Sequence, residues 1–221
     1  MSHDLHDWVP RPHPDRQMIE GRYARLEPLD PARHGSDLFN ASMAEGADDR
    51  FRYLFEAPVP RPDFDTWLAR AAASSDPMFW TVIDRQTGRA EGRQALMRID
   101  AGHGVIEIGN ILWGPAITRS RMATEALYLF AAHAFETLGY RRFEWKCNSL
   151  NEPSRRAAIR FGFTFEGIFR QHMVTKGQNR DTAWFAITDA DWPRLMARYN
   201  AWLDPANFDA AGQQKKRLEA C

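Results

Sequence analysis

Residues 109–163 of the chain read GNILWGPAITRSRMATEALYLFAAHAFETLGYRRFEWKCNSLNEPSRRAAIRFGF, and this stretch decides the fold. Apolar side chains at helical spacing over 121–138 predict a helix, which Gly139 ends as a C-cap residue. Residues 141–147 alternate apolar and charged side chains and therefore predict a strand. A short helix is expected over 151–163, so the stretch predicts strand, helix, strand and helix in succession.

The sequence on both sides adds further strands and helices. We expect a strand from Gly21 and a helix over 30–45, because Asp30 is a preferred N-cap and Pro31 suits the first helical position. The remaining expected elements are a helix from Pro62, strands at 78–84, 88–100 and 104–117, a strand pair at 164–174 and 181–188, and a last helix at 189–203. This order predicts an α/β domain around one mixed sheet, and the GxGxxG motif of dinucleotide folds is absent.

The two ends of the chain differ in composition from its middle. Residues 1–18 are polar and rich in proline, which favours an N-terminal arm that lies on the domain or extends into solvent. Residues 19–203 carry the periodic elements and form the predicted domain. Residues 204–221 are polar, and we expect a frayed C-terminal tail there.

The composition is balanced, with 29 basic and 29 acidic residues among 221. This balance argues against nucleic acid as a partner, because no excess of cations is available for phosphates. No apolar run approaches the roughly 20 residues of a membrane span, so no membrane partner is expected. The two cysteines, Cys147 and Cys221, form no CxxC pair and the histidines are scattered, which favours a reduced cytoplasmic protein without bound metal.

The junction between the strand that ends near Ile117 and the helix that starts near Ser120 is suited to an anion. The first turn of a helix presents unpaired backbone N–H groups and a partial positive charge, and both favour phosphate. Arg119 and Arg121 lie at this start, where cations oppose the helix dipole unless a bound dianion reverses that cost. The alternative is that both arginines point into water or pair with Glu125.

This pattern resembles the acetyl-CoA-binding core of the GNAT N-acetyltransferases, and it is similar to the ribosomal-protein N-acetyltransferase type. The residues that match its Ala-Thr-Glu-Ala, Asn-x-x-Ser and Gly-Phe motifs are Ala123–Ala126, Asn151, Ser154, Gly162 and Phe163. The resemblance covers roughly residues 19–195, with the specific motifs between 107 and 163. It departs at the phosphate loop, where the family glycine falls on Arg121 and the leading Arg/Gln on Thr118, so the pyrophosphate geometry is expected to differ.

The resemblance implies an α/β fold: a single GNAT-like domain with a mixed, mostly antiparallel central sheet flanked by helices. In that family two central strands are splayed and form the acetyl-CoA cleft, and Gly109 is expected to mark a bulge there. The strand before the cleft pairs with the pantetheine arm through its backbone. The residues implied in binding acetyl-CoA are Ile111, Leu112, Trp113, Thr118, Arg119, Ser120, Arg121, Met122, Ala123, Thr124, Asn151 and Ser154.

Two residues are candidates for catalysis. Glu107 resembles the family's glutamate at the acyl end of the cleft and is the candidate base that takes a proton from the amine. A lone strand glutamate is also commonly solvated or ion-paired, and a water chain is the other candidate base. Ser154 is the candidate acid for the departing thiolate, because the usual tyrosine position falls on Ala158; it could equally only stabilise its helical turn. Asn151 is an N-cap whose family counterpart also contacts the cofactor.

Three further features admit both a chemical and a structural interpretation. Backbone N–H groups at Ile111 or Leu112 would polarise the thioester carbonyl in the manner of an oxyanion site. Cys147 could form an acyl-cysteine, but its apolar strand face favours a buried, inert thiol. Tyr53 and neighbouring aromatic residues could line an acceptor pocket or belong to the core.

Three functional hypotheses follow. The first is an N-acetyltransferase that moves the acetyl group of acetyl-CoA to a primary amine by direct attack in a ternary complex; the acceptor could be a protein N-terminus, an amino acid, a polyamine or an antibiotic amine. The second is a non-catalytic acyl-CoA-binding sensor or regulatory module of the same fold. The third is an unrelated α/β protein. An edge strand or an exposed helix could also serve a homodimer.

Overall fold

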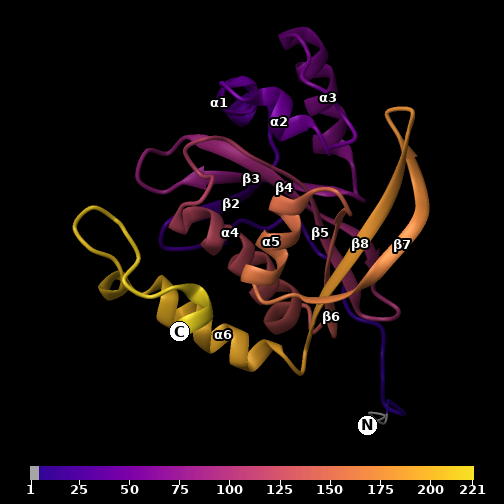
Figure 1. Ribbon diagram of the computed structural model, residues 1–221, viewed down its shortest axis with the longest axis vertical. Helices are drawn as coiled ribbons and strands as arrows, with labels where there is room; N and C mark the ends of the chain where they lie inside the picture. The colour runs from indigo at the N-terminus through magenta and orange to yellow at the C-terminus, as the bar shows by residue number, and fades with distance from the viewer. Residues whose placement is uncertain (1–4) are drawn as a thin grey trace.

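The computed structural model describes residues 5–221 and shows one eight-stranded sheet with helices on both faces (Figure 1). The strand order is β1-β2-β3-β4-β5-β6-β8-β7. The strands are β1 (Ile19–Glu20), β2 (Ala24–Pro28), β3 (Met78–Asp84), β4 (Ala90–Asp100), β5 (Val105–Trp113), β6 (Arg142–Asn148), β7 (Thr164–Thr175) and β8 (Gln178–Thr188). Every neighbouring pair is antiparallel except β5 and β6, so the predicted mixed, mostly antiparallel sheet is confirmed.

Local sequence signals explain most of the helices. They are α1 (Pro31–Met43), α2 (Ala47–Phe51), α3 (Arg61–Ala73), α4 (Arg121–Ala132), α5 (Glu152–Arg160) and α6 (Trp192–Leu203). The predicted N-cap of α1 is confirmed, since the Asp30 carboxylate accepts from the backbone N–H of Ala32 at 2.9 Å. The helix expected over 121–138 is α-helical only to Ala132, and its last turn, His133–Thr137, is π-helical. The short α2 was not predicted.

Two layers of helices cover the sheet, and strand alternation decides which side chains each layer meets. On β3, Phe79 and Ile83 belong to the core under α1 and α3. Trp80 points to the other face, where its ring packs edge-on against Phe130 of α4 with centroids 5.2 Å apart. Figure 1 shows α1 and α3 on one side of the sheet and α4, α5 and α6 on the other.

Of the described residues, both the N-terminal arm from residue 5 and the C-terminal segment contact the domain. In the N-terminal arm, Trp8 donates its indole N–H to the carbonyl of Gly102 at 2.7 Å, so the described part of the arm lies on the domain; residues 1–4 fall outside the described residues. At the C-terminal end, Phe208 is 8% and Leu218 is 1% exposed, and both belong to the main core. At these two positions the tail is not frayed, because the Phe208 ring packs edge-on against Trp202 of α6, with centroids 5.1 Å apart, and Leu218 lies in the same core.

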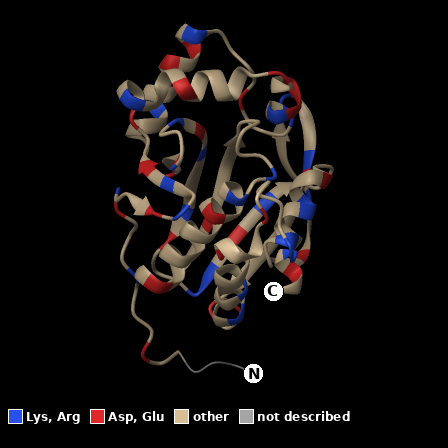
Figure 2. Ribbon diagram, turned by 90° about the vertical axis from the view of Figure 1, so that its left-hand side faces the viewer, with Lys and Arg blue, Asp and Glu red and all other residues tan. Residues whose placement is uncertain are grey.

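Charge is spread over the molecule without a dominant sign. Figure 2 shows Lys and Arg interspersed with Asp and Glu along the ribbon, in line with the balanced composition. Over residues 5–221, none of the helices is both long enough and apolar enough to cross a membrane. The same residues contain no cluster of three or more His, Cys, Asp or Glu side chains arranged to hold a metal ion.

Candidate active site

The two central strands separate after four residue pairs. β5 and β6 pair in parallel from Val105↔Arg142 to Ile108↔Trp145, and beyond that point neither strand has the other as a partner. The C-terminal half of β5 therefore has a free backbone edge on the β6 side. Such a splayed pair is the arrangement that the sequence predicts for the cleft.

A β-bulge lies where β5 leaves β6. On β4, Arg93 is opposite Leu112 whereas Ala95 is opposite Gly109, so β5 carries one extra residue in this interval. Asn110 takes up the extra length in the left-handed region, with φ 49°. The guanidinium of Arg93, buried to 2% exposure, donates to the carbonyl of Asn110 at 2.8 Å and fixes the bulge. The predicted bulge is confirmed, next to Gly109 rather than on it.

A cavity of about 620 Å³ occupies the space between the splayed strands. Its walls come from β5, β6, the start of α5 and the segment 49–55, which comprises the end of α2 and the residues after it. The segment is fixed across the cleft by Tyr53, whose hydroxyl donates to the carbonyl of Leu150 at 3.1 Å. Tyr53 thus lines the cavity, whereas the equally aromatic Trp80 is core.

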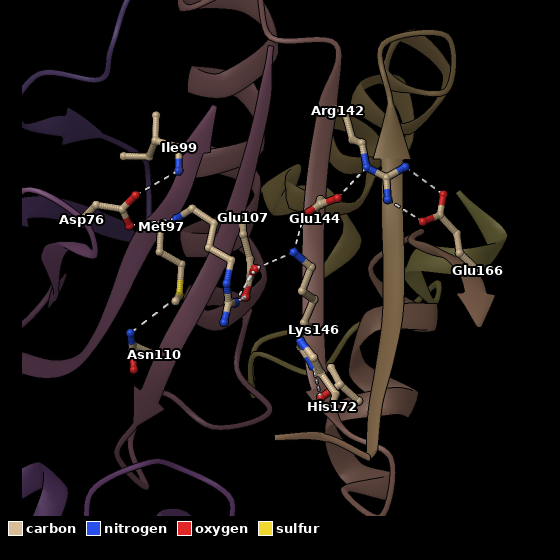
Figure 3. Close-up of polar contacts among 12 residues, drawn as sticks. Asp76, Met97, Ile99, Glu107, Asn110, Arg142, Glu144, Lys146, Glu166 and His172 are labelled. Atoms are coloured by element: carbon tan, nitrogen blue, oxygen red, sulfur yellow. Dashed lines mark hydrogen bonds and ion pairs between the residues drawn. The ribbon is translucent and has the colours of Figure 1, made fainter. Parts of the chain in front are cut away.

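Glu107 enters the cavity as part of a chain of ion pairs on the face that α1 and α3 cover (Figure 3). One Arg98 guanidinium nitrogen contacts both Glu107 carboxylate oxygens, at 2.9 and 2.8 Å. Lys146 lies 3.0 Å from Glu107 and 2.6 Å from Glu144. Arg142 joins Glu144 to Glu166 and closes this ion-pair chain at β7.

The ion-pair chain is mostly buried, and burial explains its strict alternation of sign. Glu107 is 2% exposed and Glu144 is 6% exposed, so each carboxylate needs a cation. The ammonium of Lys146 lies 3.8 Å from the ring centroid of Trp184, which covers it. The hydrogen bonds from Arg142 lower the pKa of the Glu166 carboxyl. Of the two interpretations of Glu107, the geometry matches the ion-paired one, and its carboxylate still faces the cavity.

Ser154 lies on the opposite face of the sheet, beside Trp145 and Cys147. The side chain of Asn151 accepts from the backbone N–H of Ser154 at 3.2 Å, so Asn151 is an N-cap. The Ser154 hydroxyl oxygen accepts from the Trp145 indole N–H at 3.0 Å, and the same hydroxyl is hydrogen-bonded to the Cys147 thiol. Burial raises the pKa of the Cys147 thiol, as expected for an inert buried cysteine. Ala158, at the usual tyrosine position, is fully buried.

The start of α4 has the features of an anion site. Ser120 is its N-cap, and its hydroxyl oxygen accepts from the backbone N–H of Ala123 at 3.3 Å. Within residues 5–221, no group accepts a hydrogen bond from the backbone N–H of Arg121 or of Met122. Thr118 donates its hydroxyl to the carbonyl of Gly114 at 2.9 Å and shapes the loop. Arg119 is exposed and has a positive φ of 60°.

The two remaining charged residues of this helix act structurally. The Arg121 guanidinium lies 4.4 Å from the ring centroid of Tyr23, so it neither points into water nor pairs with Glu125. Glu125 is 4% exposed. Its carboxylate accepts hydrogen bonds from three successive backbone N–H groups that lead into β2, those of Arg22 at 2.9 Å, Tyr23 at 2.5 Å and Ala24 at 2.6 Å. The glutamate of the Ala-Thr-Glu-Ala motif therefore joins α4 to the sheet edge.

Other residues expected to bind acetyl-CoA divide between cavity and core. Ile111 lines the cavity, while Leu112 is buried at 2% exposure beside it. Trp113 donates its indole N–H to the side chain of Gln94 at 3.3 Å. Met122 and Ala123 belong to the core, and the Thr124 hydroxyl accepts from Arg160 at 3.1 Å. Side chains of α4 thus pack inward, and only its first backbone amides remain available.

Sequence reasoning missed much of the cavity lining, including Arg50, Phe55, Arg98 and Arg180. Arg98 has a positive φ of 47° at a β4 bulge, and neither the bulge nor its pairing with Glu107 has a sequence signature. The segment 49–55 lies next to the cavity only through tertiary packing. Lys146 was visible as the charged face of a strand, but its contact with Glu107 depends on which strands are neighbours.

The residues present are suited to a nucleotide thioester. An open helix start suits a pyrophosphate, a free strand edge suits an amide-containing arm, and the cavity between β5 and β6 gives room for a thioester and an amine.

Comparison with known proteins agrees with this arrangement. The family model for the acetyltransferase (GNAT) domain matches residues 25–164. A GCN5-related N-acetyltransferase from Brucella melitensis is 59% identical, with a TM-score of 0.96 over 97% of this chain and 98% of that one. A GNAT-family protein from Chromobacterium violaceum is 40% identical, with a TM-score of 0.80 over 87% and 96% of the two chains.

Two further relatives are more distant. The chain is 29% identical over 108 residues to Uncharacterized N-acetyltransferase YoaA of Bacillus subtilis (strain 168). The matched region covers 49% of this chain and 60% of that protein. A solved structure with the same fold is the acetyl transferase of Salmonella typhimurium that modifies the N-terminal serine of ribosomal protein L7/L12. Its TM-score is 0.66 at 16% identity, and the match covers 78% of this chain and 99% of that one. On the family-model match and the full-length likeness at 59% identity, the chain belongs to the GNAT acetyltransferase family.

Proposed function

We propose that the protein transfers the acetyl group of acetyl-CoA to a primary amine by direct attack in a ternary complex. The observation that carries this proposal is the cavity between β5 and β6, which has lining residues from both faces of the sheet. Glu107 and Lys146 come from the face under α1 and α3, and Ser154 comes from the face under α4 and α5. An amine and a thioester can thus approach each other from opposite sides of one opening.

Acetyl-CoA is held by backbone groups at two places in this proposal. The free N–H groups of Arg121 and Met122 bind the pyrophosphate, which the partial positive charge of the helix start favours even without the family glycine. The open edge of β5 at Ile111–Trp113 pairs with the pantetheine arm, with Asn151 and Ser154 on the other side. Bound there, acetyl-CoA supplies the activated acetyl group. A backbone N–H of Ile111 or Leu112 polarises its carbonyl.

Glu107 accepts the proton that the amine must lose. Because Arg98 and Lys146 already contact both carboxylate oxygens, a water between amine and carboxylate relays the proton. Ser154, whose hydroxyl lies between the Trp145 indole N–H and the Cys147 thiol, donates a hydrogen bond to the leaving thiolate. A base in this position is typically worth about 10²- to 10⁴-fold in rate.

The test is the release of CoA thiol in the presence of a panel of primary amines. Wild-type protein should release thiol with at least one amine, and Glu107→Gln should lower kcat by about 10²- to 10⁴-fold while its Kd for acetyl-CoA is unchanged. Glu166→Gln, at the far end of the same ion-pair chain, is the matched control and should keep its kcat. Unchanged kcat in Glu107→Gln would remove Glu107 as the base. Acetyl-CoA binding without release by any amine would instead identify a sensor module.

We further propose a homodimer through β7, which is the last strand of the sheet. Its outer surface exposes the apolar side chains Phe165, Ile168, Phe169 and Val174, at 45%, 44%, 52% and 81%. An unpaired strand edge with such side chains favours association with a second copy.

A further inference from the structure

Arg180 lies at the point where the cavity passes the end of β6. The last β6–β8 pair is Asn148↔Thr182, so Arg180 is two residues beyond it and has no strand partner on that side. Strand alternation places Arg180 on the same face as Trp184, which covers Lys146. Arg180 therefore lies on the side of the cavity that Glu107 lines, where the amine would bind, and not on the side that Ser154 lines.

The Arg180 guanidinium is buried without a carboxylate partner. The residue is 8% exposed, its Nε donates to the Thr182 hydroxyl at 3.3 Å, and its terminal nitrogens have no hydrogen-bond acceptor in the described chain. The guanidinium carbon lies over the Phe55 ring, 5.2 Å from the ring centroid. No carboxylate oxygen of residues 5–221 lies within 4.0 Å of an Arg180 guanidinium nitrogen, which is the distance limit for an ion pair. Burial also lowers the pKa of Arg180, because desolvation disfavours the charged guanidinium.

The other cations of the cavity are already compensated or occupied. Arg98 and Lys146 share Glu107, and Arg52 pairs with Asp49 at 2.6 Å. Arg50, which is only half-buried, donates to the backbone carbonyls of Glu45 and Ser42, at 2.8 and 3.3 Å. Arg180 is therefore the cavity cation that is most deeply buried yet holds no anion. A guanidinium of this kind matches the planar, bidentate geometry of a carboxylate.

We propose that the acceptor amine carries a carboxylate, which Arg180 binds while Glu107 serves the amine. This inference rests on the proposed acetyl transfer and adds the substrate class: small amino acids and related amino carboxylates, rather than polyamines or aminoglycosides. Phe55, next to the Arg180 guanidinium, lines the same part of the cavity. The carboxylate offsets the charge of the buried guanidinium, so the pair is worth more than one at an exposed site.

The experiment compares amino acids with their own carboxamides as acceptors, which keeps the amine and the side chain and removes only the negative charge. For wild-type protein, kcat/KM should be about 10- to 100-fold higher for the acid than for the amide, the range of a charge-assisted hydrogen-bond pair. Arg180→Met should reduce this ratio to about one. Arg180→Lys, which keeps the charge but not the planar fork, should give an intermediate ratio. Arg170→Met, an exposed arginine on β7 outside the cavity, should keep the full ratio.

Equal use of acids and amides by wild-type protein would overturn the inference even if the Arg180 variants do not fold. An unchanged ratio in a folded Arg180→Met protein would overturn it as well. A second readout does not need turnover: a carboxylate lacking the amine should raise the Tm of wild-type protein but not of Arg180→Met. If no amine releases thiol, the proposed transfer fails, and this Tm shift alone then decides whether Arg180 forms an anion site.

Discussion

Glu125 provides a quantitative test of how the fold positions the cofactor site. Its carboxylate is 4% exposed and accepts three backbone N–H groups, those of Arg22, Tyr23 and Ala24. Glu125→Gln keeps one carbonyl oxygen, which can serve the Tyr23 and Ala24 amides, but it sets an NH₂ donor against the N–H of Arg22. One charge-assisted bond is lost, two are weakened and a buried donor is left unpaired, for a loss of about 3 kcal/mol.

The assay is thermal and urea unfolding of wild type and variant. For a chain of 221 residues, a loss of about 3 kcal/mol lowers the Tm by about 6–12 °C. Glu136→Gln is the control. The Glu136 carboxylate accepts from the Trp192 indole N–H at 2.6 Å, and the Gln carbonyl can still accept this bond. Its free energy of unfolding should therefore change by less than about 1 kcal/mol. If Glu125→Gln melts within about 2 °C of wild type, the cost of burying this charge cancels its hydrogen bonds and the reasoning is refuted.

Three other predictions follow from the geometry. Gly109→Ala places a Cβ 2.4 Å from the Met97 sulfur beside the bulge, so kcat/KM for thiol release should fall by about 100-fold. Gly102→Ala is the control: its Cβ makes only an ordinary van der Waals contact, and the variant should keep wild-type activity. Burial lowers the pKa of His133, so the unfolded chain takes up a proton at a higher pH than the folded protein does. The free energy of unfolding should therefore fall as the pH drops from about 7.5 to about 5.5. Urea titrations should show a smaller fall for His133→Leu. Sedimentation should show a dimer for wild type and a monomer for Ile168→Asp; two equal sedimentation profiles would exclude β7 as the interface.

Periodicity and capping predicted the elements well because both are local. Asp30 caps α1 through amides two and three residues away, and Asn151 caps α5 through the amide of Ser154. The charged face of β6 was equally visible in its alternation. The sequence did not show that α4 ends in a π-helical turn, nor that Phe208 and Leu218 reach the core, because both depend on distant packing partners.

The candidate site was predicted only where a family motif marks it. Glu107 and Ser154 do line one cavity, yet the partners that define their chemistry come from elsewhere in the chain. Arg98 reaches Glu107 through a bulge, and the position of Arg180 depends on where β6 ends along β8. Such contacts are set by strand order and register, which residue spacing within one strand does not encode.

The central claim is that the opening between β5 and β6 brings an acetyl thioester and an amine together. The most direct measurement mixes wild-type protein, acetyl-CoA and the amine panel, and quantifies free CoA thiol and acetylated amine in the same reaction. The account predicts that both products appear in equal amounts and only when an amine is present. Saturable binding of acetyl-CoA with no acetylated amine from any acceptor, and no thiol above the hydrolysis background, would contradict it.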